Sequence, residues 1–200
     1  MSKINALCVY CGSSPGTDPA FVETAQAFGK ILAENDIRLV YGGGSSGLMG
    51  ALAHAVLDHG GAVTGIIPEF LTRRERPRGV GQELIVTRDM HERKRVMFDR
   101  ADGFVALPGG IGTLEEVVEQ LTWAQLGRHE KPILIANIKG YWDPLLTLVD
   151  HMRSVEFLPP SLRVDFLVAD RVTDILPKLI DAARDVSEVQ KAMAVPAERM

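Results

Sequence analysis

Short apolar runs alternate with longer amphipathic stretches along the whole chain. The apolar runs predict strands over residues 4–10, 37–41, 62–67, 83–87, 103–107, 132–136 and 165–168. The amphipathic stretches predict helices over residues 19–34, 46–58, 90–100, 113–126, 142–153 and 174–185. Because the strands are apolar on both faces and alternate with helices, we expect an α/β fold: one doubly wound, Rossmann-like parallel sheet of about seven strands, with helices on both faces.

One segment interrupts this alternation. Residues 69–82 have no clear period, and they contain four arginines around Glu75 together with two glycines. We expect a loop there, which either carries solvated charge or binds an anion. The rest of the pattern predicts a single domain over residues 1–186, followed by a tail, residues 187–200, that is frayed or disordered.

Composition and charge narrow the class of protein. With 200 residues, of which 46% are hydrophobic and 24% charged, the chain is typical of a globular domain that has its own core. The net charge of −4 lacks the basic excess of nucleic-acid binders, so we expect no nucleic-acid partner. No apolar run approaches the roughly 20 residues of a membrane-spanning helix, and the first residues lack a signal-peptide pattern. We therefore expect a cytoplasmic protein that does not bind membranes.

The two cysteines, Cys8 and Cys11, have the spacing of a C-x-x-C motif. Residues three apart in a strand face opposite sides of the sheet, and Cys8 lies within an apolar run. We therefore predict a buried, reduced Cys8 rather than a redox pair or a metal site.

Three glycine-rich turns each follow a predicted strand and lead to a predicted helix. We call residues 11–16 the first turn, residues 42–47 the second turn and residues 108–113 the third turn. The carboxyl ends of parallel strands share one edge of the sheet, where ligands bind. Backbone N–H groups and helix N-termini that converge there can hold a phosphate. The three turns therefore predict an anionic, nucleotide-like ligand.

The second turn also fits the dinucleotide pattern G-x-G-x-x-G at Gly42, Gly44 and Gly47. This match leaves open an oxidoreductase that uses a nicotinamide cofactor. However, the next predicted strand runs into Pro68, where that fold would require an acidic residue to bind the ribose.

The third turn is followed by three carboxylates, Glu115, Glu116 and Glu119, which we place in and just after the first turn of a helix. Negative charges there would repel a pyrophosphate, so they favour one phosphate on the glycines and a carboxylate that reaches a sugar carbon. Glu116 also has a structural interpretation, because Thr113 and Glu116 have the spacing of a capping box.

A second polar cluster, residues 90–94, begins the helix after the fourth predicted strand. Since adjacent residues do not share one helical face, we expect at least one of Arg93 and Lys94 to point into the crevice while the other meets solvent or a partner chain. The alternative is a solvated basic helix end.

Residues 108–116 (PGGIGTLEE), taken together with residues 90–94 (MHERK), resemble the LONELY GUY family of cytokinin-activating phosphoribohydrolases. Residues 9–14, 40–44 and 122–127 are also similar to segments of that family, so the resemblance covers most of the chain. Members are often labelled lysine decarboxylases. Such an enzyme would use pyridoxal phosphate on a Schiff-base lysine, and no segment of this sequence recommends one.

The resemblance implies hydrolysis of the N-glycosidic bond of a nucleoside 5′-monophosphate, N6-modified adenosine monophosphate in the cytokinin case, without a cofactor or metal. The products would be the free base and ribose 5-phosphate. In this reaction positive charge grows on the sugar and negative charge grows on the leaving base. By motif position, Glu116 would stabilise the sugar cation, hold the ribose hydroxyls or orient water, and Arg93 would assist departure of the base or hold the substrate.

The resemblance also implies a set of substrate contacts, with the 5′-phosphate at the start of the helix that follows the third turn. The implied residues are Glu75, Lys94, Gly109, Gly110, Ile111, Gly112, Thr113, Leu114, Glu115 and Thr122, with Ser13, Ser14 and Gly43 nearby.

Family members similar to this chain form homodimers in which helices near the glycine motif pack between subunits, so a homodimer is expected. A second hypothesis for the function is a non-catalytic carrier that binds a nucleotide or molybdenum cofactor on the same fold. Glu116 and Arg93 discriminate between the two, because a carrier has no turnover to lose when either is changed.

Overall fold

A computed structural model describes residues 4–72, 82–158 and 165–193, with side chains as far as Arg184. Its centre is one seven-stranded sheet in the order β4-β3-β2-β1-β5-β6-β7, and every neighbouring pair of strands is parallel. The strands are β1 Ala6–Tyr10, β2 Arg38–Tyr41, β3 Val63–Pro68, β4 Gln82–Thr87, β5 Gly103–Ala106, β6 Ile133–Ala136 and β7 Leu167–Ala169. The predicted doubly wound parallel sheet is confirmed.

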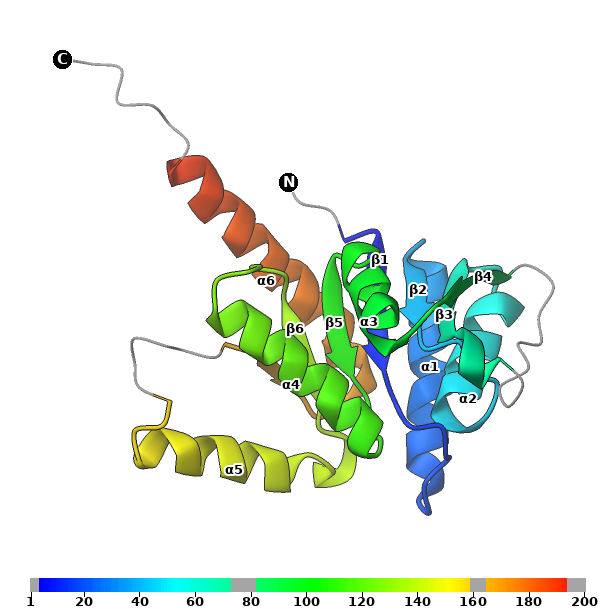
Figure 1. Ribbon diagram of the computed structural model, residues 1–200, viewed down its shortest axis with the longest axis horizontal. Helices are drawn as coiled ribbons and strands as arrows, with labels where there is room; N and C mark the ends of the chain where they lie inside the picture. Colours follow the sequence, from blue (N-terminus) through cyan, green and yellow to red (C-terminus); the bar gives the residue numbers. More distant parts are fainter. Residues whose placement is uncertain (1–3, 73–81, 159–164, 194–200) are drawn as a thin grey trace.

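Six α-helices cover the two faces of the sheet in the part of the chain that the structure describes (Figure 1). One face carries α1 Pro19–Glu34, α2 Gly47–Asp58 and α6 Val172–Met193. The other carries α3 Met90–Asp99, α4 Ile111–Gln125 and α5 Asp143–Ser154. Two short 3₁₀ turns, η1 Glu69–Leu71 and η2 Ile138–Gly140, follow β3 and β6.

Strand β1 shows why the sheet is buried on both sides. Leu7 and Val9 pack into the core beneath α1, α2 and α6, whereas Cys8 and Tyr10 pack into the core beneath α3, α4 and α5. This period of two makes the strand a continuous apolar run in the sequence.

The strand order changes direction between β1 and β5. From β1 the chain builds outward through β2, β3 and β4, and it then returns to place β5, β6 and β7 on the other side of β1. Such a switch point opens a crevice at the carboxyl ends of the two central strands. The first and third turns leave β1 and β5 at this crevice.

Two helices, α4 and α6, differ from the prediction by two or more residues at an end. Helix α4 begins at Ile111, two residues before the predicted start, with Gly110 as its N-cap residue. Helix α6 continues to Met193, beyond the predicted end at residue 185. The division into a domain and a tail from residue 187 stays a prediction. In the described segments no helix is long and apolar enough to cross a membrane.

Candidate active site

The first and third turns contact each other at the switch point. The Gly12 N–H donates a hydrogen bond of 3.0 Å to the Pro108 carbonyl. Gly109 has no room for a side chain, since a Cβ there would lie 2.2 Å from Thr113 Oγ1 and 2.8 Å from the Gly12 nitrogen. The two turns therefore form one continuous backbone surface above β1 and β5.

Helix α4 presents its N-terminus at this surface. Its first interior bond runs from the Leu114 N–H to the Gly110 carbonyl, 3.0 Å away. Among the described residues, the N–H groups of Ile111, Gly112 and Thr113 have no acceptor. Because three unpaired donors coincide with the positive end of the helix dipole, this position can bind an anion.

The capping-box interpretation of Glu116 is wrong. With Gly110 as N-cap, Thr113 is the third residue of the helix rather than its cap, and Glu116 lies in the second turn. For the same reason Glu115, Glu116 and Glu119 fall after the first turn of α4, not within it.

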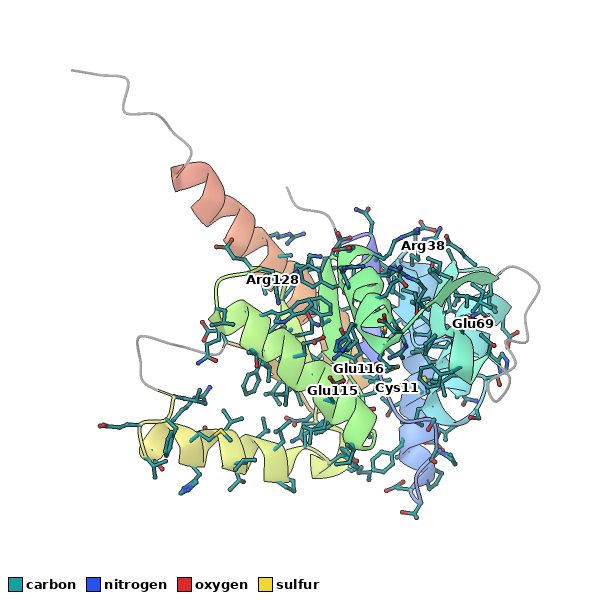
Figure 2. All side chains as sticks on the ribbon, in the orientation of Figure 1. Cys11, Arg38, Glu69, Glu115, Glu116 and Arg128 are labelled. Carbon is teal, nitrogen blue, oxygen red and sulfur yellow. The ribbon has the colours of Figure 1, made fainter. Side chains whose placement is uncertain are left out.

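Glu116 instead forms a buried ion pair with Arg93 of α3. Arg93 Nη1 lies 2.6 Å from Glu116 Oε1, and the two residues are only 7% and 8% exposed. Arg93 Nε donates to the Ile66 carbonyl at 3.1 Å, which anchors the guanidinium at the end of β3. Figure 2 shows Glu116 on the side of α4 that faces α3. Charge-assisted bonds of this kind fix both groups in place.

Two opposing effects, burial and the Arg93 charge, determine the pKa of Glu116. Burial raises the pKa of the Glu116 carboxyl, and the Arg93 charge opposes that rise without cancelling it. The charged form of Glu116 is therefore unfavourable in its buried position, and the Arg93 guanidinium stabilises that charged form.

Lys94 is buried beside this pair and also binds α4. Its ammonium contacts Glu115 and lies 2.9 Å from Glu119 Oε1. Burial disfavours the charged form of Lys94, but the two glutamates more than offset this effect, and the pKa of Lys94 is raised. The prediction that one of Arg93 and Lys94 would point away from the crevice is wrong, because both long side chains reach across to α4.

The second turn has a different role from the other two. The N–H groups of Leu48 and Met49, at the start of α2, donate to the Gly12 carbonyl at 3.0 and 3.2 Å. A Cβ at Gly42 would lie 2.2 Å from Arg93 Nη2, so this glycine makes room for the guanidinium. Gly43, at φ +76°, packs against Ile67 of β3. Because protein atoms take up the donors of α2, this arrangement does not favour a dinucleotide on the G-x-G-x-x-G segment.

A cavity of about 230 Å³ lies between the first and third turns. Ser13 and Ser14 line it on one side, and Gly109 and Gly110 line it on the other. Tyr141, which follows η2, also lines the cavity and donates a hydrogen bond of 2.5 Å to the Gly109 carbonyl. Sequence reasoning missed Tyr141, although its place just after β6 puts it at the same sheet edge.

One predicted contact is not brought into this cluster, and another cannot be placed in it or outside it, because it falls between the described segments. Thr122 lies on the exposed outer face of α4, where its hydroxyl donates to the Val118 carbonyl at 2.8 Å. Glu75 and the arginines around it lie outside the described residues.

The cysteines are free and buried, on opposite faces of the sheet. Burial raises the pKa of both thiols, which disfavours a reactive thiolate. Across the described residues, no group of three or more His, Cys, Asp or Glu side chains is placed to hold a metal.

Solved structures share this architecture at low sequence identity. The molybdenum cofactor binding protein of Rippkaea orientalis has a TM-score of 0.66 and 17% identity, covering 90% of this chain and 98% of that one. The Moco carrier protein of Chlamydomonas reinhardtii has a TM-score of 0.67 and 20% identity, covering 92% of this chain and 99% of that one. At such identities the likeness concerns the fold alone.

Relatives at higher identity include plant proteins of one kind. The family described as possible lysine decarboxylase matches residues 49–179. The chain is 44% identical over 178 residues to the cytokinin riboside 5′-monophosphate phosphoribohydrolase LOG of Oryza sativa subsp. japonica, covering 89% of this chain and 74% of that one. It is 43% identical over 182 residues to LOG3 of Arabidopsis thaliana, named as the same activity, covering 91% of this chain and 85% of that one. The chain therefore belongs to the LONELY GUY (LOG) family of phosphoribohydrolases, which the lysine decarboxylase description also covers.

Proposed function

We propose that this protein hydrolyses the N-glycosidic bond of N6-modified adenosine 5′-monophosphates, releasing the free base and ribose 5-phosphate. The observation that carries the proposal is the buried Arg93–Glu116 pair one helical turn beyond the open N-terminus of α4. The names of the relatives, which share over 40% identity with this chain, support the same activity.

The spacing along α4 suits a phosphorylated sugar. Glu116 is five residues after Ile111, which is about 7.5 Å along a helix axis. One ligand can therefore bind at two points: an anionic group on the N–H groups at the start of α4, and an electron-poor carbon beside the Glu116 carboxylate. A pentose 5-phosphate has a phosphate at one end and the anomeric carbon at the other.

In the reaction proposed here, the phosphate binds at residues 109–114, with the Ser13 and Ser14 hydroxyls as additional donors. As the bond from the sugar to the base breaks, positive charge grows on the anomeric carbon and the Glu116 carboxylate stabilises it. Water adds its hydroxyl group to that carbon, and its remaining proton goes to the departing base. Arg93 keeps Glu116 ionised in its buried position and presents a cation to the leaving base. Lys94 holds Glu115 and Glu119, which keeps the two helices in register beside the substrate.

The test is a chromatographic assay on purified protein without metal or cofactor. AMP and isopentenyl-adenosine monophosphate serve as substrates, and free base and ribose 5-phosphate are the products measured. We expect Glu116→Gln to reduce turnover by about 10²-fold or more, since it removes charge stabilisation in the transition state. The control, Glu34→Gln, changes an exposed carboxylate at the far end of α1 and should leave turnover unchanged.

The hydrolase hypothesis and the carrier hypothesis predict different results in this assay. Release of base by the wild type and loss of release in Glu116→Gln support the hydrolase. Nucleotide binding without any release of base would contradict the proposed activity and favour a carrier.

We also propose a homodimer formed through the outer face of α4. Ile111, Val118 and Leu126 form an exposed apolar stripe at helical spacing, and Ile111 and Leu126 are 81% and 73% exposed. Glu115 and Thr122 lie on the same stripe. Light scattering should give twice the chain mass for the wild type, and the mass of one chain for Val118→Lys if this face is the interface.

The two free cysteines suit a reducing compartment, which supports a cytoplasmic location.

A further inference from the structure

Three successive carbonyl groups of the third turn are each held by a different donor. The Pro108 carbonyl accepts from the Gly12 N–H at 3.0 Å, and the Gly110 carbonyl accepts from the Leu114 N–H at 3.0 Å. Between them, the Gly109 carbonyl accepts from the Tyr141 hydroxyl at 2.5 Å. The middle bond is the one of the three that comes from a side chain.

The middle bond also sets the direction of a backbone donor. The Gly109 carbonyl and the Gly110 N–H belong to one planar peptide group, and the described residues contain no cis peptide bond. In a trans peptide these two groups point in opposite directions. Because Tyr141 draws the carbonyl toward itself, it turns the Gly110 N–H away from its ring. A peptide between two glycines has little steric hindrance to rotation, so without this bond it can adopt other orientations.

Neighbouring rings hold Tyr141 in position for this bond. Phe21 of α1 packs edge-on against the Tyr141 ring at 5.5 Å between centroids, and Trp142 packs edge-on at 5.0 Å. Trp142 is itself buried, and its backbone N–H donates to Asn137 Oδ1 at 2.8 Å. The hydroxyl is therefore supplied by a ring that two other aromatic rings hold in place.

We propose that Tyr141 is a positioning residue for the 5′-phosphate: its hydroxyl orients the Gly109–Gly110 peptide so that the Gly110 N–H joins the donors at the start of α4. This inference rests on the proposed function for its ligand. Tyr141 also lines the 230 Å³ cavity, which is below the roughly 300–1,000 Å³ of a site for a whole drug-sized ligand. The cavity is thus of a size to hold one group of the substrate, such as its phosphate, rather than the entire nucleotide.

The experiment compares two products as probes, because neither is consumed. Calorimetric titration measures the affinity of the wild type and Tyr141→Phe for ribose 5-phosphate and, separately, for adenine. We expect Tyr141→Phe to weaken ribose 5-phosphate binding by about 3- to 10-fold, the usual effect of one hydrogen bond. Adenine affinity should stay within about twofold. In steady-state assays KM for AMP should rise by the same factor while kcat stays unchanged.

The matched control is Tyr41→Phe, which removes another tyrosine hydroxyl. The Tyr41 hydroxyl accepts from Gln82 Nε2 at 2.9 Å, between β2 and β4, and strand β1 separates these strands from β5 and the third turn. This variant should bind ribose 5-phosphate like the wild type.

The outcomes separate this inference from the proposed function. An unchanged affinity of Tyr141→Phe for ribose 5-phosphate, or an equal loss for both probes, would overturn the positioning role even if AMP is hydrolysed. A selective loss for ribose 5-phosphate in a protein that does not hydrolyse AMP would support the positioning role and reject the activity. A wild type that does not bind ribose 5-phosphate would overturn the positioning role, and the release of base in the chromatographic assay would still decide the activity.

Discussion

The second and third turns look alike in sequence but have opposite arrangements of donors. Each is a glycine-rich connection from a buried strand to a helix. In the second turn, the first N–H groups of α2 donate to the Gly12 carbonyl. In the third turn, Gly12 and Tyr141 bind the carbonyls instead, and the first N–H groups of α4 have no acceptor among the described residues.

This difference shows what a glycine-rich turn needs in order to bind an anion. In the second turn the glycines make room for protein atoms, with Arg93 against Gly42 and Ser13 against Gly47. In the third turn, Gly110 and Gly112 border open space, since a Cβ at either would have no atom within 4 Å. The glycines therefore permit close packing in the second turn, whereas in the third turn Gly109 packs closely but Gly110 and Gly112 leave room for a ligand.

The largest effect on stability should come from Gly47→Ala. Gly47 has φ +58°, and a Cβ would lie 2.3 Å from the Ser13 carbonyl carbon, which is backbone and cannot move aside cheaply. The left-handed conformation and the overlap together should lower the free energy of unfolding by about 2–5 kcal/mol. Denaturant titration measures this loss. A variant as stable as the wild type would show that the second turn is not a packing turn.

Gly42→Ala should reduce activity in a protein that still folds. The atom nearest to a new Cβ is Arg93 Nη2, at the end of a flexible side chain, so the protein can fold with the guanidinium displaced. Glu116 then loses its partner, and we expect kcat/KM to fall by about 10²-fold. If the two changes act through the same ion pair, the double variant Gly42→Ala/Arg93→Gln should lose little more than Arg93→Gln alone. Additive losses would contradict this route.

The sequence predicted the sheet and its helices well because burial on both faces leaves apolar runs that are easy to recognise. The pattern predicts the seven strands and six α-helices that the structure describes. The start of α1 also has a local cause, because the Asp18 side chain accepts a hydrogen bond from the Ala20 N–H. The start of α4 was misplaced because Gly112 weakens the helical pattern, although Gly110 adopts the extended conformation of an N-cap.

The site was predictable only as far as it depends on local pattern. The Arg93–Glu116 pair joins residues 23 positions apart, and the family motifs indicated both. The inward direction of both Arg93 and Lys94 depends on how α3 packs against α4, which no short segment encodes. Tyr141 carries no motif at all, and its contact with Gly109 spans 32 positions. Its role follows from strand order rather than from sequence.

The pH dependence of activity tests whether Arg93, which packs against Gly42 of the second turn, controls the pKa of Glu116 in α4. Because burial raises the pKa of Glu116, activity should fall on acidification at a pH above the ordinary titration range of a carboxyl group. Arg93 lowers this pKa, so its displacement in Gly42→Ala should move the loss of activity to still higher pH. The substrate phosphate titrates identically in both assays, and the difference between the two profiles therefore reports on the protein. If the wild type and Gly42→Ala lose activity at the same acidic pH, Arg93 does not control the ionisation of Glu116.

The smallest effect, and the counterpart of Gly47→Ala, should come from Gly112→Ala in the third turn. Gly112 lies inside α4 with no atom within 4 Å of a new Cβ, so nothing in the described structure opposes the substitution. Alanine is about 1 kcal/mol better than glycine within a helix, and the free energy of unfolding should stay equal or rise by up to that amount. A methyl group among the open donors should at the same time weaken ribose 5-phosphate binding, which calorimetry measures. A clear loss of stability in Gly112→Ala would show that the third turn, like the second, is closed by packing, and the contrast between the two turns would fail.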